Sequence, residues 1–145
     1  HPVYNEPMSQ GTRCRQLAAF VLYHSGIGTM ADNITTYEKE AECAEFIASV
    51  PCEWDESIAL DGRIGEYIIV ARRRGDEWFL AGMTDWTPRN VVVDLDFLDA
   101  SDWKIEIFED STSPQTYRKS VKEYYGEPLR VTMKSGGAFA ARITK

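Results

Sequence analysis

Cysteine and histidine are scarce in this sequence of 145 residues, which contains three cysteines and two histidines. Cys14, Cys43 and Cys52 are too few for a disulfide framework, and their spacing matches no zinc-binding pattern. His1 and His24 have no cysteine or acidic residue at the spacing of a metal site or a catalytic triad. We therefore expect buried free thiols. A Cys43–Cys52 disulfide is the alternative in an oxidising compartment. We expect no catalytic residue, cofactor site or metal site in this chain.

Positive charge is also sparse: the sequence has 16 lysines and arginines against 23 acidic residues, which gives a formal net charge of −7. The one basic run, residues 72–74, lies beside a predicted hairpin turn. A nucleic acid or an anionic membrane requires a basic surface, so the composition argues against both as partners. No apolar run reaches the roughly 18 residues of a transmembrane helix, and we predict no membrane span.

An acidic series between residues 94 and 102 has a superficial similarity to a calcium-binding loop. Asp94, Asp96, Asp99 and Asp102 lack the central glycine and the terminal bidentate glutamate of an EF-hand. Asp94 and Asp96 also alternate with the apolar residues of a predicted strand. We therefore interpret the series as a solvated strand face.

Four tryptophans are candidates for a binding role, because exposed aromatic rings can stack on sugars. Two of them lie among apolar residues of a predicted hairpin, and large aromatic side chains dominate both cores and interfaces. We favour core or domain-interface positions over sugar contact for each of Trp54, Trp78, Trp86 and Trp103.

The first half of the sequence has a helical pattern. Ser9 or Thr12 is a suitable N-cap for a first helix, which the glycines at 26 and 28 would end. Residues 17–23 are apolar in every direction around that helix, which is typical of a helix buried in a larger body.

A second helix is predicted over residues 37–50, ended by Pro51. Its first turn contains Glu38 and Glu40, which suit the positive end of the helix dipole. Glu38 and Glu42 lie one turn apart on this helix, and we interpret them as solvated surface carboxylates.

From about Ser57 the apolar residues recur with a period of two, which indicates strands. Strands are predicted over 62–74, 77–86, 90–98, 102–110, 128–134 and 136–144. Residues 117–125 fit a helix or an edge strand, and we favour the strand. Short strands at this spacing favour an antiparallel β-sandwich, so the predicted fold is mainly β, preceded by one or two helices.

The hairpin of residues 62–86 has apolar side chains on both faces, whereas a sheet with one solvated face alternates. One face would fill the sandwich core. The other face of the hairpin must also be buried, and we expect it to pack on a domain outside this chain. The apolar helix of residues 17–23 would belong to that same body.

Four segments of the sequence are informative when taken together: "SQGTRCRQLAAFVLYHSGIGTMAD", "YEKEAECAEFIASVPCEWDES", "LDGRIGEYIIVARRRGDEWFLAGMTDW" and "SGGAFAARI". They resemble the C-terminal end of glycoside hydrolase family 97, which comprises α-glucosidases and α-galactosidases. The similarity extends in order over nearly the whole chain and is weakest between residues 101 and 127.

The resemblance implies an N-terminal β-supersandwich, a central (β/α)8 barrel and a C-terminal β-sandwich. On this pattern residues 1–56 are a helical remnant of the catalytic barrel and a bridge, with the last barrel helix over 11–30. Residues 57–145 are the C-terminal sandwich. Residues 1–10 would lead from the last barrel strand, so Tyr4, Asn5 and Glu6 would approach the active site.

The chemistry that the resemblance implies is calcium-dependent hydrolysis of α-glycosidic bonds by a pair of carboxyl groups. The barrel motif similar to "REGVRGxE", which carries the acid and the calcium ligands, does not occur in this sequence. We therefore expect a non-catalytic portion that packs on and stabilises the barrel and is inactive alone. The resemblance also implies a periplasmic or secreted location.

Two alternatives from other functional classes stay open. A stand-alone carbohydrate-binding module would present a planar strip of exposed tryptophans. An interaction domain would associate through the apolar hairpin, and the same surface would allow self-association.

Overall fold

The computed structural model describes residues 11–23, 41–51, 53–99, 102–113 and 116–145. Within those ranges two helices precede eight strands, and neither helix has the length and apolar character needed to cross a bilayer. The elements are α1 (Arg13–Leu22), α3 (Ala41–Ser49), β1 (Glu56–Arg63), β2 (Tyr67–Arg74), β3 (Glu77–Thr84), β4 (Arg89–Val93), β5 (Trp103–Asp110), β6 (Tyr117–Tyr124), β7 (Leu129–Met133) and β8 (Ala138–Thr144).

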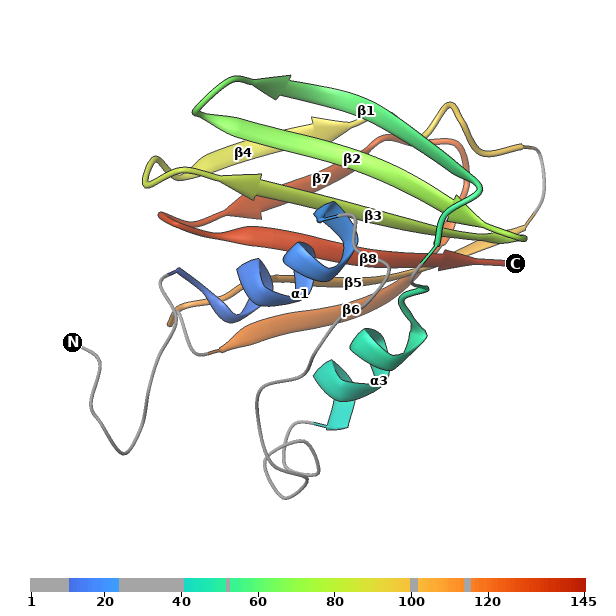
Figure 1. Cartoon of the computed structure of the whole chain (residues 1–145), viewed down its shortest axis with the longest axis horizontal. Helices are drawn as coiled ribbons and strands as arrows, with labels where there is room; N and C mark the ends of the chain where they lie inside the picture. Colours follow the sequence, from blue (N-terminus) through green and yellow to red (C-terminus); the bar gives the residue numbers. More distant parts are fainter. Residues whose placement is uncertain (1–10, 24–40, 52, 100–101, 114–115) are drawn as a thin grey trace.

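The strands form two antiparallel sheets that face each other. The large sheet has the order β1-β2-β3-β8-β5-β6, and the small sheet pairs β4 with β7. Figure 1 shows the helices on one side of the large sheet and β4 and β7 on the other. The predicted antiparallel β-sandwich with preceding helices is therefore confirmed.

The alternating side chains of the large sheet enter two separate cores. On β3, Trp78 and Leu80 point toward the small sheet, whereas Phe79, Ala81 and Met83 point toward the helices. The inner core between the sheets buries, among others, Ile69, Leu80, Val93, Ile105, Ile107, Leu129, Met133, Phe139 and Ile143. Because neither face of β3 is solvated between Trp78 and Met83, the strand is apolar over those residues.

The outer core lies between the large sheet and the two helices. Phe46 of α3 packs edge-on against Phe79 and Phe108, with ring centroids 6.2 Å and 5.3 Å apart. Trp54 contacts Phe79 at 5.4 Å, and Phe108 contacts Tyr117 at 5.5 Å. The helices are therefore part of the sandwich's own packing.

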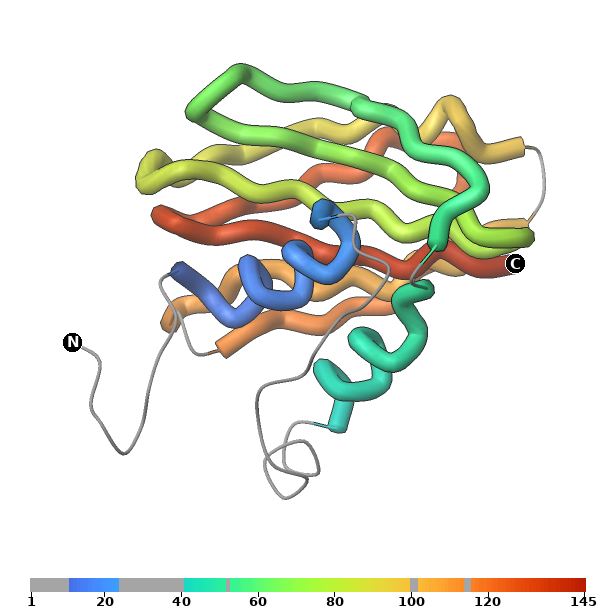
Figure 2. Tube along the Cα trace, viewed as in Figure 1, coloured from blue at the N-terminus to red at the C-terminus, as the bar shows by residue number. Residues whose placement is uncertain are grey.

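The expectation that a body outside the chain covers the second face of the hairpin is wrong for most of that face. Helix α1 contacts β3, β8 and β5. Figure 2 shows α1 lying over these strands, and neither of the two described helices lies over the β1–β2 hairpin. The outward side chain of Ile68 on β2 is accordingly 46% exposed, whereas Phe79 on β3 is fully buried.

Helix α1 buries one stripe of side chains against the sheet of this chain. Its buried residues are Cys14, Leu17, Ala18 and Val21, with the i, i+3, i+4, i+7 spacing of a helix that rests on a surface. Ala19, Phe20 and Leu22 are half-buried. Apolar composition alone does not say which side of residues 17–23 meets the sheet, and burial of the other sides in a larger body stays a prediction.

Both ends of α1 are capped by identifiable groups. Thr12 is the N-cap, and its Oγ1 accepts a hydrogen bond from the Arg15 backbone N–H at 3.2 Å. At the other end, Arg72 Nη2 donates to the Leu22 carbonyl oxygen at 2.9 Å. This contact ties the last turn of α1 to β2.

Two strand boundaries differ from the prediction. The segment predicted as one strand over 62–74 is the end of β1, a turn at residues 64–66 and β2, because Gly65 adopts a positive φ of 77°. The strand predicted over 90–98 ends at Val93, after which Leu98 N–H donates to the Leu95 carbonyl in a turn. Residues 117–124 form the predicted strand.

Several residues of the sequence predictions lie outside the described ranges. They are His1, Tyr4, Asn5, Glu6, Ser9, His24, Gly26, Gly28, Glu38, Glu40 and Cys52. The Cys43–Cys52 bridge therefore stays a prediction, with Cys43 itself buried.

Candidate interaction surface

The four tryptophans do not form a common strip. Trp78 and Trp103 are buried in the inner core, and Trp54 is half-buried against Phe79. Trp86 alone among the four is exposed, at 66%. The arrangement expected of a stand-alone carbohydrate-binding module is therefore missing from these residues.

The acidic series of residues 94–102 is spread along a loop. Asp94, Asp96 and Asp102 are exposed, although Asp94 and Asp96 follow β4 and are not part of it. Asp99 accepts a hydrogen bond from Trp103 Nε1 at 3.1 Å, and its other oxygen lies 3.5 Å from Lys145 Nζ. Among the described residues, no three histidine, cysteine or acidic side chains are grouped as a metal site. Within the described ranges, the calcium that the resemblance implies therefore finds no grouped donor set, and the cofactor expectation stays a prediction.

A hollow of about 740 Å³ lies on the outer face, where α1 leaves the sheet uncovered. Its floor comes from β1, β2 and β3 through Ala59, Gly62, Ile68 and Met83, and Arg15 of α1 forms one wall. The hollow exists because β1 carries small residues at its outward positions. A Cβ at Gly62 would lie 3.1 Å from the Tyr67 carbonyl oxygen, so a larger residue would crowd the backbone of β2.

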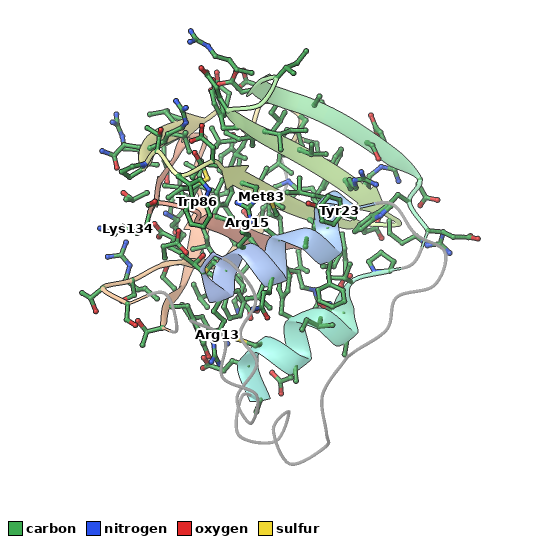
Figure 3. The ribbon with its side chains drawn as sticks, turned by 60° about the vertical axis from the view of Figure 1, so that its left-hand side comes forward. Arg13, Arg15, Tyr23, Met83, Trp86 and Lys134 are labelled. Atoms are coloured by element: carbon green, nitrogen blue, oxygen red, sulfur yellow. The ribbon has the colours of Figure 1, made fainter. Side chains whose placement is uncertain are left out.

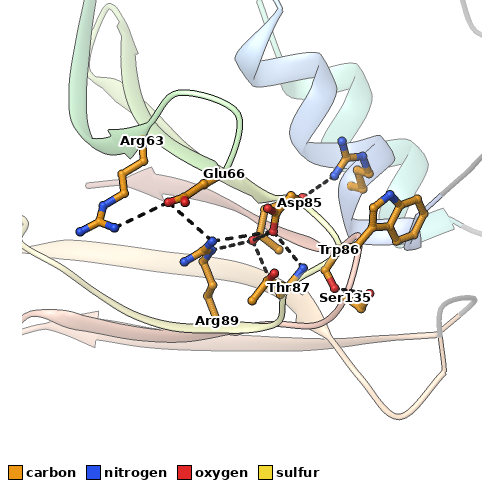
Figure 4. A network of polar contacts seen from close by, with 9 residues as sticks. Arg63, Glu66, Asp85, Trp86, Thr87, Arg89 and Ser135 are labelled. Atoms are coloured by element: carbon orange, nitrogen blue, oxygen red, sulfur yellow. Dashed lines mark hydrogen bonds and ion pairs between the residues drawn. The ribbon is translucent and has the colours of Figure 1, made fainter.

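The rim of the hollow is a network of paired charges, drawn in Figure 4. Arg89 Nη2 lies 3.9 Å from Glu66 Oε2 and 3.8 Å from Asp85 Oδ1. Arg63 also approaches Glu66, at 3.7 Å. Arg89 Nε donates to Thr84 Oγ1 at 3.1 Å. These contacts join the β1–β2 turn to the segment after β3.

Helix α1 is attached to the same rim. Arg15 Nη1 donates to the Thr84 carbonyl oxygen at 2.7 Å, and the Thr12 backbone N–H donates to the Gly136 carbonyl at 3.3 Å. The Thr84 hydroxyl in turn donates to the Thr87 carbonyl at 2.9 Å. The first turn of α1 is therefore fixed against the loops at the ends of β3 and β7.

Trp86 lies beside this hollow, in a smaller one of about 220 Å³ that Arg15, Asp85 and Gly136 also line. Figure 3 shows Arg15 and Trp86 near the start of α1, whereas Tyr23 lies at its end. The indole ring rests on Gly136, where an added Cβ would meet it at 2.6 Å. Ser135 Oγ donates to the Trp86 carbonyl oxygen at 2.6 Å. The side chain is exposed on a fixed backbone.

The carboxylates of the rim are occupied by structural contacts. Asp61 accepts hydrogen bonds from the Gly62 backbone N–H at 2.8 Å and from the Tyr67 hydroxyl at 3.1 Å. The bond to Asp61 raises the pKa of the Tyr67 phenol, with burial a smaller cause. Glu66 and Asp85 are held by arginines. Such groups suit a rigid surface for protein contact better than proton transfer, which needs a carboxyl group that faces substrate.

The sequence predicted neither the hollow nor the separate position of Trp86. The available signal was the run Thr84-Asp85-Trp86-Thr87, in which a large aromatic follows a strand end among turn-forming residues. The hollow itself depends on where α1 stops covering the sheet.

Residues 53–144 match the family model described as "Glycosyl-hydrolase 97 C-terminal, oligomerisation". This chain belongs to that family. The resemblance inferred from the sequence is thereby confirmed. The match begins close to the predicted domain boundary at residue 57, which stays a prediction.

Two curated relatives of this chain are much longer proteins. A retaining α-galactosidase of Bacteroides thetaiotaomicron is 42% identical over 151 aligned positions, which cover 99% of this chain and 22% of that protein. A probable retaining α-galactosidase of Streptomyces bingchenggensis is 29% identical and is covered to 20% of its length. The chain thus spans about a fifth of the length of these curated relatives.

A solved structure agrees with the fold. A family 97 enzyme from Pseudoalteromonas sp. strain K8, in complex with acarbose, superposes with a TM-score of 0.87 at 30% identity. The superposition covers 97% of this chain and 23% of that chain. It therefore includes the helices as well as the sandwich.

Proposed function

We propose that this chain is the C-terminal, non-catalytic part of a family 97 glycoside hydrolase that acts on α-galactosidic bonds. The observation that carries the proposal is the similarity to a retaining α-galactosidase along 99% of this chain but only 22% of that relative. The domain packs on the catalytic barrel and stabilises it. Calcium dependence and a periplasmic or secreted location belong to the same proposal.

The chemistry of the described residues is consistent with a non-catalytic role. Glycoside hydrolysis requires two carboxyl groups on opposite sides of the scissile bond, about 5–5.5 Å apart in retaining enzymes. The carboxylates Asp61, Glu66 and Asp85 around the hollow are each engaged by donors of this chain. We expect the purified chain of residues 1–145 to leave α-galactosides uncleaved.

The first experiment is the intact mass of the native protein as isolated from its source, followed by an α-galactoside hydrolysis assay. A mass several times 16.5 kDa, with α-galactosidase activity, supports the proposal. A native mass of 16.5 kDa overturns it. A large protein that cleaves only α-glucosides, as other members of the resembled family would, overturns the α-galactoside assignment alone.

Oligomerisation is the second candidate, because the description of the matched family includes it. The exposed apolar residues Ile64, Ile68 and Trp86 are the observation that favours such a contact. Sedimentation of the native protein over a series of concentrations tests it. The mass of the assembly, and its fall as dilution dissociates it, would give the number of copies.

A further inference from the structure

We propose that the free edge of β6 is a contact between two copies of this chain, whose β6 strands pair antiparallel about a two-fold axis at Val121. The pairing joins the two large sheets into one continuous sheet. This proposal rests on oligomerisation as a proposed function, and it adds the strand, the symmetry and the register of the contact. The family description names none of these.

Strand β6 is an unpaired border of the large sheet. The strand order runs from β1 to β6, and Figure 1 shows these two strands at opposite borders. Each of the eight residues of β6 pairs with β5, without a shift of register, and no other described strand pairs with β6. Such an edge presents a row of unpaired backbone N–H and C=O groups, which a further strand can bind.

The other strand edges are less suited to pairing with a second chain. Strand β1 has an irregularity between Ala59 and Asp61 in its pairing with β2, and the Gly62 backbone N–H already donates to the Asp61 carboxylate at 2.8 Å. Strands β4 and β7 have five residues each. Bulges and short edge strands disfavour pairing with another chain. Among the described strands, β6 is therefore the edge that is both long and regular.

Strand β6 is fixed at both ends before any partner binds. At its start the Tyr117 hydroxyl donates to Glu42 Oε2 of α3 at 2.9 Å. At its end the Tyr124 hydroxyl donates to the Leu95 carbonyl oxygen at 3.4 Å. A strand that is already ordered loses little conformational entropy on binding, which favours association.

Exposed apolar side chains accompany this edge. Val121 is 51% exposed in the second half of β6, and Tyr125, directly after the strand, is 78% exposed. Neither residue lines the hollow beside α1. Isolated edge strands usually carry charged residues along their length, so the exposed valine suits an edge that another strand covers.

Two-fold symmetry restricts the possible registers. An axis normal to the sheet keeps the helix-covered faces of both copies on the same side, so a residue of one face opposes a residue of the same face. A register centred on a charged residue of β6 places that residue opposite its own copy. A register centred on Ser120 places Arg118 opposite Lys122. Like charges directly opposite each other are destabilising.

The register centred on Val121 opposes no like charges. It places Lys119 opposite the partner's Glu123, and the axis repeats this pair. Oppositely charged cross-strand pairs stabilise a sheet. The two Val121 side chains also meet at the axis and cover each other. The lysines of β6, which would hinder pairing with an unrelated strand, thus favour pairing with a second copy of this chain.

The test uses the complete polypeptide that contains residues 1–145, with the variants Val121→Lys and Val121→Cys. Val121 is half-exposed, so either change leaves the fold of the domain intact. Lysine places two like charges at the axis, and cysteine places two thiols there. Opposed residues of an antiparallel pair have Cα atoms about 4.5–5.5 Å apart, which a disulfide can span. The matched controls are Val92→Lys and Val92→Cys, because Val92 is 56% exposed on β4 of the small sheet.

Sedimentation over a series of concentrations and mild oxidation are the measurements. We expect Val121→Lys to raise the dissociation constant of the assembly by about tenfold or more, with Val92→Lys equal to wild type. We also expect a mild thiol oxidant to convert Val121→Cys into a covalent dimer on a non-reducing gel. Wild type and Val92→Cys should run as single chains after the same treatment.

A wild-type dissociation constant for Val121→Lys, or the lack of a covalent dimer of Val121→Cys, would overturn the proposal. Dissociation by Ile64→Lys in place of Val121→Lys would also overturn it, because the hollow would then join the copies. A wild-type polypeptide that is monomeric at every concentration would overturn oligomerisation itself, and the β6 contact with it. Failure of the glycosidase proposal is distinguishable, since it appears in the α-galactoside assay of the wild-type polypeptide.

Discussion

Replacing Leu17 by alanine tests whether α1 is part of the sandwich core or only a remnant of another domain. Leu17 is 2% exposed and lies in the outer core with Phe79, Phe108 and Ala140. Leucine-to-alanine changes at such positions cost about 3 kcal/mol, from the lost transfer free energy and the cavity left behind. The rigid sheet below α1 limits collapse into that cavity, so we expect the full cost.

The assay is urea unfolding of the 145-residue chain, followed by circular dichroism. With a slope of about 2 kcal/mol per molar urea for a domain of this size, the midpoint should fall by roughly 1.5 M. The control is Glu45→Ala on the exposed side of α3, which should change the free energy of unfolding by less than about 0.5 kcal/mol. Equal midpoints for the two variants would refute the conclusion that α1 contributes to this core.

Three further predictions follow from single contacts. Gly136→Ala should destabilise the chain by about 1–3 kcal/mol in urea unfolding and alter the fluorescence of Trp86, because Gly136 has φ +64° and an added Cβ meets the ring. Burial, assisted by nearby carboxylates, raises the pKa of the Cys14 thiol, so Cys14 should resist a thiol reagent at pH 8 until urea unfolds the chain. A hydrogen bond from the Gly75 N–H, with smaller help from neighbouring arginines, lowers the pKa of Asp55. Its stabilising contribution is therefore present above the ordinary carboxyl pKa and is lost as the pH falls through the lowered value; an NMR titration in which Asp55 shows an ordinary pKa would contradict this.

The strands were predictable because their signal is local. Alternation over residues 102–110 and 128–134 placed β5 and β7 correctly, since a period of two directly reports which side chains face the core. The strand β1 was missed as a separate element. Its outward residues Ala59 and Gly62 are small and its edge position leaves it largely exposed, so it lacks a strong apolar alternation.

The helices were predictable in type but not in environment. Thr12 and the apolar run of residues 17–23 indicated α1, yet only the packing shows that Leu17 and Val21 face the sheet while Tyr23 is 66% exposed. Apolar composition reports that a residue prefers burial. It does not say which distant element provides that burial.

The sequence by itself determined the β-rich class and the family. It also showed that the barrel motif expected to carry the catalytic acid does not occur in these 145 residues. Those conclusions depend on periodicity and on residues read in order, which need no knowledge of distant contacts. The tertiary structure decided that α1 and α3 cover the second face of the sheet and that Trp86 is exposed beside a hollow. These features depend on how segments far apart in sequence meet: α1 covers β3, β8 and β5 but leaves Ile68 on β2 uncovered.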